Sequence, residues 1–463
     1  MTGHVTIDVL PDDILLEVFD CYLGRTPYVA EMDEWHTLVH VSRKWRCVVF
    51  NSPCRLNLRL VCSARTPVRE MLTIWPPLPI VICEYNPSQF NEDNIIAALE
   101  QHDRVCRFEL YGVSSSLLEK LLTAMQEPFP ALAYLKLVTW DDMAPVIPDS
   151  FLGGFAPKLD GLRLTRIPIP PPVLRKLLLS TTNLVELSLP KILYSEYFSP
   201  EAMVTCLSAL TRLKYLNFGF KFRRSRIYWE NRRPPPPTRT LLPALRHLVF
   251  TGVSEYLEGL VARIDAPLLD SLTMAFFHQL IFDTPQLSQF ISHSGRRQKD
   301  EAHSVARVIF SDSRVTVSLP GRFPFGLSLE ISCRQSDWQL SAVAQVCSSS
   351  FPQAFIQAVE YLYILEEGPS QLCWQDDIEN SQWLELLHPF TGVKNLFLSH
   401  KSETRIAPAL QELVGERIDE VLPALQSIHL DQRSGLVPMA IGRFVTARHF
   451  SSHPIAMVPW TGY

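Results

Sequence analysis

The side chains with the most suggestive spacing for chemistry are two histidines and three adjacent pairs of aspartates. His449 and His453 are four residues apart and could share a helix face, but Pro454 follows and no third metal ligand is near. Adjacent carboxylates diverge on any regular element, so they do not converge as acid and base. Helix starts and turns explain these pairs: Asp12 with Asp13, Asp141 with Asp142, and Asp376 with Asp377.

Known catalytic motifs are absent from the sequence. It contains no G-x-x-x-x-G-K-[ST], G-x-G-x-x-G, G-x-S-x-G or H-E-x-x-H, and its ten cysteines include no C-x-x-C pair. Proline outnumbers glycine 36 to 18, which argues against loops that need positive φ angles around a phosphate. We therefore expect no catalytic residue, no metal and no cofactor.

The charge balance restricts the possible partners. The 463 residues carry 43 Lys and Arg against 48 Asp and Glu, for a net charge of -5. No basic field is present to attract a nucleic acid, so none is expected as a partner. No secretory signal opens the chain and no apolar run approaches 18 residues, so we expect no membrane association and a location in the cytoplasm, the nucleus or both.

One six-residue phrase recurs from residue 105 onward: apolar, two variable residues, apolar, one variable residue, apolar. The interval between the phrases that start at 305 and 359 is wider than the others and predicts one more unit at 327–331. Strands of this pattern, separated by helices every ~25 to 35 residues, are typical of a solenoid. The phrases lie at 105–110, 132–137, 159–164, 184–189, 213–218, 245–250, 269–274, 305–310, 359–364, 393–398 and 425–430.

Helical patterns lie between these phrases, at 92–100, 116–125, 172–180, 201–210, 285–292, 338–346, 379–387 and 409–421. The predicted fold class is therefore α/β, a leucine-rich-repeat-like strand–helix solenoid with a curved parallel sheet, preceded by a short helical domain. A doubly wound α/β domain is the alternative. It fits less well because its strands, buried on both faces, would be continuous apolar runs.

Residues interleaved with the core positions of each strand point to the opposite face. That face mixes aromatic and charged side chains, which suits protein recognition, although an ordinary solvated face would look the same. The candidate substrate-binding residues are Tyr134, Arg163, Tyr215, His247, Tyr361, Tyr363 and Phe397.

Two polar insertions interrupt the pattern. Residues 221–239 carry seven Lys or Arg and four consecutive prolines, which exclude a helix or strand interior. This tract could contact RNA or act as a localisation signal, but a solvated loop explains it better. Residues 293–302 are a second polar insertion, to which we assign no chemistry.

The amino-terminal segment has a separate pattern, LPDDILLEVFDCYL at 10–23, followed by WHTLVHVSRKWRCVVFNSP at 35–53. Pro11 and the acidic pair suit a helix start. Ile14, Leu15, Val18, Phe19 and Tyr22 then form an apolar stripe. A segment of about 50 residues buries little apolar area by itself, so the apolar stripes of these helices need the solenoid or another protein to cover them.

These residues resemble the F-box, particularly that of large protein families in mushroom-forming (basidiomycete) fungi. The Leu-Pro opening, the acidic pair, the spaced aliphatic residues and the Val-Ser-Arg-Lys-Trp-Arg segment carry the resemblance over 9–53. It departs from the family at Ser42, where many F-boxes have cysteine, and in the longer turn before Trp35. Residues from 55 to 110 are more loosely similar to the junction that these fungal proteins place before their repeats.

The resemblance implies a non-catalytic substrate adaptor of an SCF-type (Skp1–cullin–F-box) ubiquitin ligase. Such a chain docks a Skp1-like adaptor, and through it the cullin and RING subunits, and holds an unknown protein substrate on its repeats. A small helical core is the competing explanation for the same side chains. The implied Skp1-binding residues are Leu10, Pro11, Ile14, Leu15, Val18, Phe19, Leu38, Val41 and Trp45.

The expected organisation is an F-box helical domain at 1–55, a junction and cap at 56–104, a solenoid at 105–433, and a cap or tail at 434–463. The alternative function is a leucine-rich-repeat scaffold without ubiquitin-ligase coupling, whose first helices merely cap the stack.

Overall fold

The computed structural model describes most of the chain. The described residues are 7–23, 35–62, 67–86, 91–192, 199–221, 238–277, 281–295, 305–319, 326–333, 336–367, 380–413, 415–431, 439–451 and 453–461. Most of the predicted insertions at 221–239 and 293–302 therefore lie outside them, as do Asp376 and Asp377. The chain forms two compact units, Met1–Tyr197 and Phe198–Tyr463.

The first unit begins with the expected helices. A short 3-10 turn precedes them, and α1 opens at the acidic pair, where carboxylates favour the positive end of a helix. Ser42 accepts a hydrogen bond from the backbone of Trp45 and so begins α3. The elements are η1 (Ile7–Val9), α1 (Asp12–Leu23), α2 (Trp35–Val39) and α3 (Arg43–Asn51).

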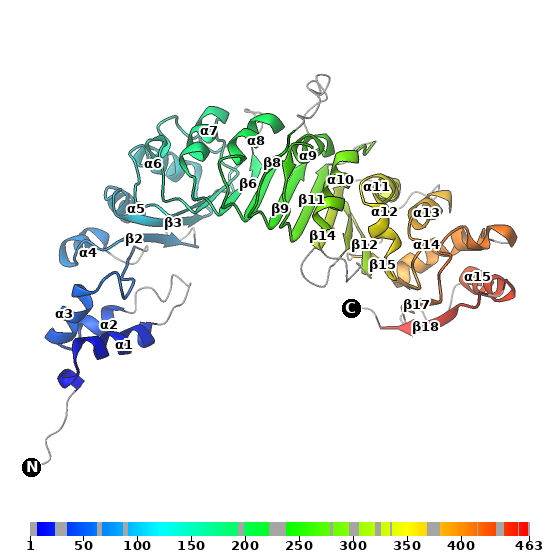
Figure 1. Cartoon of the computed structure of the whole chain (residues 1–463), viewed down its shortest axis with the longest axis horizontal. Coiled ribbons are helices and arrows are strands. Elements are labelled where there is room, and N and C mark those ends of the chain that lie inside the picture. The colour runs from blue at the N-terminus through cyan, green and yellow to red at the C-terminus, as the bar shows by residue number, and fades with distance from the viewer. Residues whose placement is uncertain are drawn as a thin grey trace, which may run out of the picture. The chain divides into compact units, whose positions relative to one another are not determined.

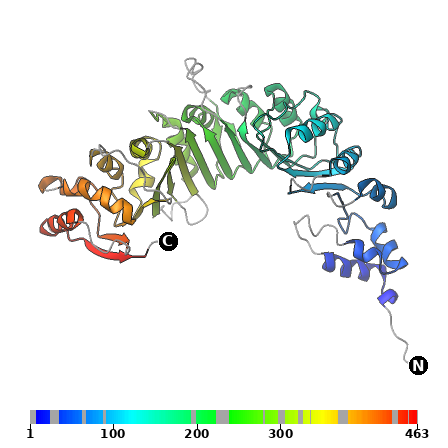
Figure 2. The ribbon, with the colours of Figure 1, turned by 180° about the vertical axis from the view of Figure 1, so that it is seen from behind.

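A parallel sheet follows, with its strands side by side in chain order and helices along one side (Figures 1 and 2). The strand–helix alternation starts at Leu60, earlier than the repeats predicted from 105, because β1 pairs in parallel with β2 and β2 pairs in parallel with β3. The elements are β1 (Leu60–Cys62), α4 (Val68–Ile74), β2 (Ile80–Glu84), α5 (Glu92–Leu99), β3 (Val105–Tyr111), α6 (Ser115–Ala124), β4 (Tyr134–Val138), η4 (Phe151–Gly154), β5 (Gly161–Thr165), α7 (Pro171–Ser180) and β6 (Glu186–Ile192).

Most strands begin two residues after the phrase that predicts them. In these phrases the first apolar residue lies in a tight turn, donating its N–H three residues back, as Leu132 does to Phe129 and Leu159 to Ala156. At 105–110 and 305–310 the first residue already belongs to the strand. Leu132 and Leu159 are fully buried. The phrase therefore combines a buried turn residue with two inward-facing strand residues, which explains its spacing.

The second unit repeats this alternation, with one departure from the prediction. Its strands lie in the order β7-β9-β11-β14-β13-β12-β15-β16-β17-β18. A two-residue turn joins β12 to β13, so these strands must run antiparallel, and β14 returns to pair with β11. The predicted unit at 327–331 is thus the third strand of a meander, and the sheet is mostly rather than wholly parallel.

The strands of this unit are β7 (Tyr215–Phe220), β8 (Thr240–Leu241), β9 (His247–Gly252), β10 (Ile264–Asp265), β11 (Ser271–Phe277), β12 (Val305–Ser311), β13 (Arg314–Leu319), β14 (Gly326–Ser332), β15 (Tyr361–Glu366), β16 (Asn395–Leu398), β17 (Ser427–Asp431) and β18 (Ala456–Trp460). β8 and β10 form a separate two-stranded sheet.

The helices of this unit are α8 (Pro200–Leu207), α9 (Ser254–Val261), α10 (Pro285–Gly295), α11 (Ser336–Ser349), α12 (Gln353–Gln357), α13 (Asn380–Leu387), α14 (His400–Gln411), η5 (Gly415–Asp419) and α15 (Met439–Phe450). The predicted helix at 409–421 is wrong in position. The helix α14 instead begins at His400 and ends at Gln411, with Pro408 in its last turn, and η5 follows within the predicted range.

The C-terminal segment forms α15 and β18, which add another strand and helix to the stack. The core lies between strands and helices, where the inward leucines of neighbouring strands align, as Leu135 does with Leu162 and Leu162 with Leu187. No helix in the described ranges is both long enough and apolar enough to cross a lipid bilayer.

Candidate functional site

Four of the nine predicted Skp1-binding residues lie inside the helical module. Leu15, Phe19, Leu38 and Trp45 are buried, and the rings of Phe19 and Trp45 are 4.7 Å apart. This corrects the prediction for these four, because α1 and α2 both pack on α3 and cover them. They support a surface rather than form one.

The other five predicted residues remain accessible. Ile14 and Val18 are 47% and 41% exposed, Pro11 and Val41 are exposed, and Leu10 is half-buried. Tyr22, which was in the apolar stripe but not in the predicted site, is 53% exposed. Because Ile14, Val18 and Tyr22 are spaced four residues apart, they form one stripe along α1, here called the N-terminal ridge.

The helix that carries the ridge is strongly acidic. It contains Asp12, Asp13, Glu17 and Asp20 and no basic residue. From α3, the Nζ of Lys44 donates to the carbonyl oxygen of Leu10 at 2.6 Å and lies 3.8 Å from the Asp12 carboxylate. Glu17 pairs with Arg55. These contacts fix α1 on its neighbours from its polar side, and the ridge stays about half-exposed, with the Tyr22 hydroxyl 3.2 Å from the Thr37 hydroxyl of α2.

Trp35 anchors the module to the first repeat, a role that sequence reasoning missed. Its side chain is 1% exposed, its ring lies edge-on to Trp75 beside α4 at 5.2 Å, and its Nε1 donates to the carbonyl oxygen of Arg59 at 2.7 Å. The signal was a tryptophan opening the second helical segment. Its partners Arg59 and Trp75, 24 and 40 residues further along the chain, could not be predicted from local spacing.

On the strand face of the first unit, Tyr134 and Arg163 lie on the adjacent strands β4 and β5. The Tyr134 ring covers Gly161, where a Cβ would lie 2.3 Å from it, and the Arg107 guanidinium lies 4.5 Å from the ring centre. Arg163 pairs with Glu186. Burial, followed by the nearby Glu186 carboxylate, raises the pKa of Tyr134 to about 12, so its hydroxyl stays neutral. These predicted contacts are therefore held in place and only half-exposed.

On the strand face of the second unit, the predicted residues form two pairs. Tyr215 and His247 are directly opposite on β7 and β9, with ring centres 6.3 Å apart. Tyr363 and Phe397 are opposite on β15 and β16 and stack at 4.2 Å. Tyr361, two residues before Tyr363, is 37% exposed.

The second pair belongs to a larger group, here called the aromatic ladder: Tyr363, Phe397, His429 and Trp460. His429 stacks on the other face of Phe397 at 4.1 Å, and Trp460 meets Phe397 edge-on at 5.5 Å. Phe397 is consequently only 8% exposed, which corrects its prediction as a direct contact. Sequence reasoning missed Trp460, which lay in the segment expected to be a cap or tail.

Ser427 and His429 have the separation of a nucleophile and its base. The Ser427 Oγ lies 2.8 Å from the His429 Nε2, but it donates its proton to the Oδ1 of Asn395 at 2.7 Å. The imidazole nitrogen must then donate to Oγ, which is the opposite direction from proton abstraction. Ser427 is also buried. The arrangement thus orients the ring of His429 within the ladder.

Acid should weaken the aromatic ladder. Burial lowers the pKa of His429 below its ordinary 6.5, so the unfolded chain takes up this proton first as the pH falls. The free energy of unfolding should therefore decrease as the pH drops below about 6.5 and level off below the folded pKa. His429→Phe keeps the stack without the titration. Urea unfolding at pH 7.5, 6.5 and 5.5 should show the variant gaining on the wild type toward low pH; a constant difference would contradict this origin.

The histidines and aspartates first considered for chemistry have other contacts. The Nδ1 of His453 lies 3.5 Å from Asp419, and Asp141 accepts the backbone N–H of Ser115 at the start of α6. Asp12 and Asp13 occupy the first turn of α1. Among the described residues, no group of three or more His, Cys, Asp or Glu side chains is arranged to hold a metal.

Comparison of the chain with known proteins adds little to the description of these surfaces. No family model matches the sequence, and no curated protein was found to match it. One solved structure that is similar is the leucine-rich repeat-containing protein LegL7 from Legionella pneumophila, with a TM-score of 0.28 and 13% sequence identity over 86% of this chain and 99% of the other.

Proposed function

We propose that this chain is a non-catalytic substrate adaptor of an SCF-type ubiquitin ligase, with an F-box at its N-terminus. One observation carries the proposal: an acidic helix presents the exposed N-terminal ridge on a module whose core is closed by Phe19 and Trp45. An exposed aliphatic and aromatic stripe on a firmly supported helix is suited to docking in the groove of a partner. The proposed partner is a Skp1-like adaptor, and through it cullin and RING subunits.

The strand faces are the proposed surfaces for a protein substrate. They present aromatic rings held by stacking and by guanidinium groups, as Tyr134 is by Arg107. Rigid aromatic side chains lose little entropy on binding, which makes them effective anchors. The ligase chemistry would occur on the partner subunits, and this chain would act by raising the local concentration of substrate lysines. The proposal places the protein in the cytoplasm or the nucleus.

Assembly from purified components tests the function. The full chain, mixed with a fungal Skp1 and a cullin–RING pair, should elute with all of them as one complex in size-exclusion chromatography. The uncoupled scaffold predicts that the chain elutes alone. Deleting 1–55 is a poor control, because it removes Trp35 and uncovers Trp75. Point variants of the exposed ridge are the better comparison.

A further inference from the structure

A row of buried core residues ends at an exposed side chain on the last strand, β18. On the side of the sheet that faces the helices, Leu362, Leu396 and Ile428 align across β15, β16 and β17, and each is fully buried. The next position in that row is Met457 on β18, which is 45% exposed. The side chain that continues the core is thus left uncovered at this end.

The helix beside it has two different faces. Ile441, Phe444 and Arg448 are buried on the side that packs toward the rest of the stack. The opposite side presents Met439 and Phe450, which are 73% and 83% exposed.

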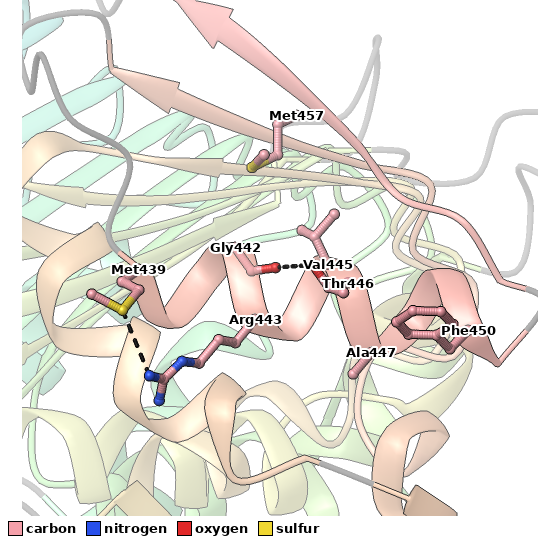
Figure 3. A pocket seen from close by; sticks show the side chains of 8 residues that line it. All are labelled: Met439, Gly442, Arg443, Val445, Thr446, Ala447, Phe450 and Met457. Carbon is pink, nitrogen blue, oxygen red and sulfur yellow. Dashed lines mark hydrogen bonds between the residues drawn. The ribbon is translucent and has the colours of Figure 1, made fainter.

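Between α15 and β18 lies an open groove of about 670 Å³ (Figure 3). Gly442 lines it, and a Cβ at that position would meet nothing within 4 Å, so the groove is open above the helix backbone. The residues that decide its chemistry are Met439, Gly442, Arg443, Thr446, Phe450 and Met457.

The groove is apolar with a cationic border. Arg443 is exposed, and its guanidinium is 3.6 Å from the sulfur of Met439; no carboxylate of the described residues pairs with it. α15 carries Arg443, Arg448 and His449 but no acidic residue, and Arg448 is already paired with Asp419. An occupant that offers carboxylates beside an apolar stripe would therefore gain both burial and charge pairing.

Other occupants fit less well. An added strand would have to pair along β18, where Pro459 lacks the N–H needed for a ladder. A second copy packed symmetrically through this face would oppose two Arg443 side chains without a counter-charge. A helix, in contrast, would continue the succession in which α13 packs on α14 and α14 on α15.

We propose that the groove between α15 and β18 binds an amphipathic helix of a partner protein, whose apolar stripe is bordered by carboxylates and lies over Met457 and Phe450. The helix would lie along α15, where a further helix of the stack would otherwise be. This site is independent of the proposed ligase function, because it uses none of the N-terminal ridge.

Selection from a library of helical peptides tests the proposal. The probes are displayed 14-residue peptides with fixed leucines at positions i, i+3, i+4 and i+7 and random flanking residues, panned on the full chain. We expect enrichment of Asp and Glu in the flanks. Phe450→Asp should weaken the selected peptides at least about tenfold. Leu179→Asp on α7, where the leucine is 45% exposed, is the matched control and should leave binding unchanged.

Arg443→Glu provides the charge-reversal test. Selection on this variant should enrich Lys and Arg in the flanks instead of Asp and Glu. The proposal is overturned if Phe450→Asp binds the peptides as well as the wild type, or if the flank preference ignores Arg443→Glu. It is also overturned if light scattering shows a wild-type dimer that Phe450→Asp converts to a monomer, because the occupant would then be a second copy.

Discussion

Replacing Ile14 and Val18 together by aspartate is expected to weaken adaptor binding strongly while leaving the melting temperature unchanged. Both side chains are about half-exposed, so the module loses little when they become polar. Burying an aliphatic side chain contributes about 1.5–3 kcal/mol, so completing the burial of two half-exposed ones also accounts for about 1.5–3 kcal/mol in total. Two unpaired carboxylates in the interface add a desolvation cost, and the total predicts a loss of about 100-fold or more in affinity.

Two comparison variants make this result specific. Ile74→Asp alters an exposed aliphatic residue outside the ridge, 68% accessible at the end of α4, and should bind the adaptor normally. Phe19→Ala removes a buried ring that packs on Trp45, so it should lower stability by about 3–5 kcal/mol and lose binding with it. Calorimetry of adaptor binding and thermal unfolding separate the two effects. Normal affinity in the Ile14 and Val18 double variant would refute the ridge as the docking surface.

The difference between Phe19 and Ile14 shows where sequence reasoning stopped. Both belong to one helical stripe, and the spacing of apolar residues gives that stripe without saying which edge is covered. Coverage depends on the packing of α1 on α3, which places Trp45 against Phe19 and leaves Ile14 47% exposed. That packing is set by contacts between segments far apart in the chain, so local periodicity could not divide the set.

The repeats were more predictable because each obeys a local rule. A turn followed by alternating burial requires the same three apolar positions, and most of the repeats use them so. The strand β13 was not predicted because its sequence RVTVSL alternates without the leading turn residue of the repeats. Its antiparallel pairing depends on the two-residue connection from β12. Trp460 was not predicted as part of the aromatic ladder because its contact with Phe397 joins β18 to β16, two strands away, and does not follow from local sequence.

The final repeat depends on one buried cation. The Arg448 side chain is fully buried, and its guanidinium donates to Asp419 at 2.6 Å and to the carbonyl oxygens of Val421 and Leu422 at 3.0 and 3.1 Å. Leu422 has a φ of 52°, which is unfavourable for a side chain with a Cβ. Arg448 thus fastens α15 to the turn before β17 and holds that turn in a conformation it would otherwise resist.

Arg448→Ala is therefore expected to destabilise the C-terminal repeat by about 3–5 kcal/mol, because it leaves a cavity and removes the guanidinium donor from the Val421 carbonyl, whereas the Leu422 carbonyl keeps the N–H of Leu425. Arg448→Met keeps most of the volume and should cost less. Asp419→Asn, at a side chain that is 44% exposed to water, should cost least of the three. Urea unfolding gives the order, and hydrogen exchange should place the loss of protection in 427–460. Equal stability of the alanine variant and the wild type would show that α15 is held by its apolar contacts alone, through Ile441 and Phe444.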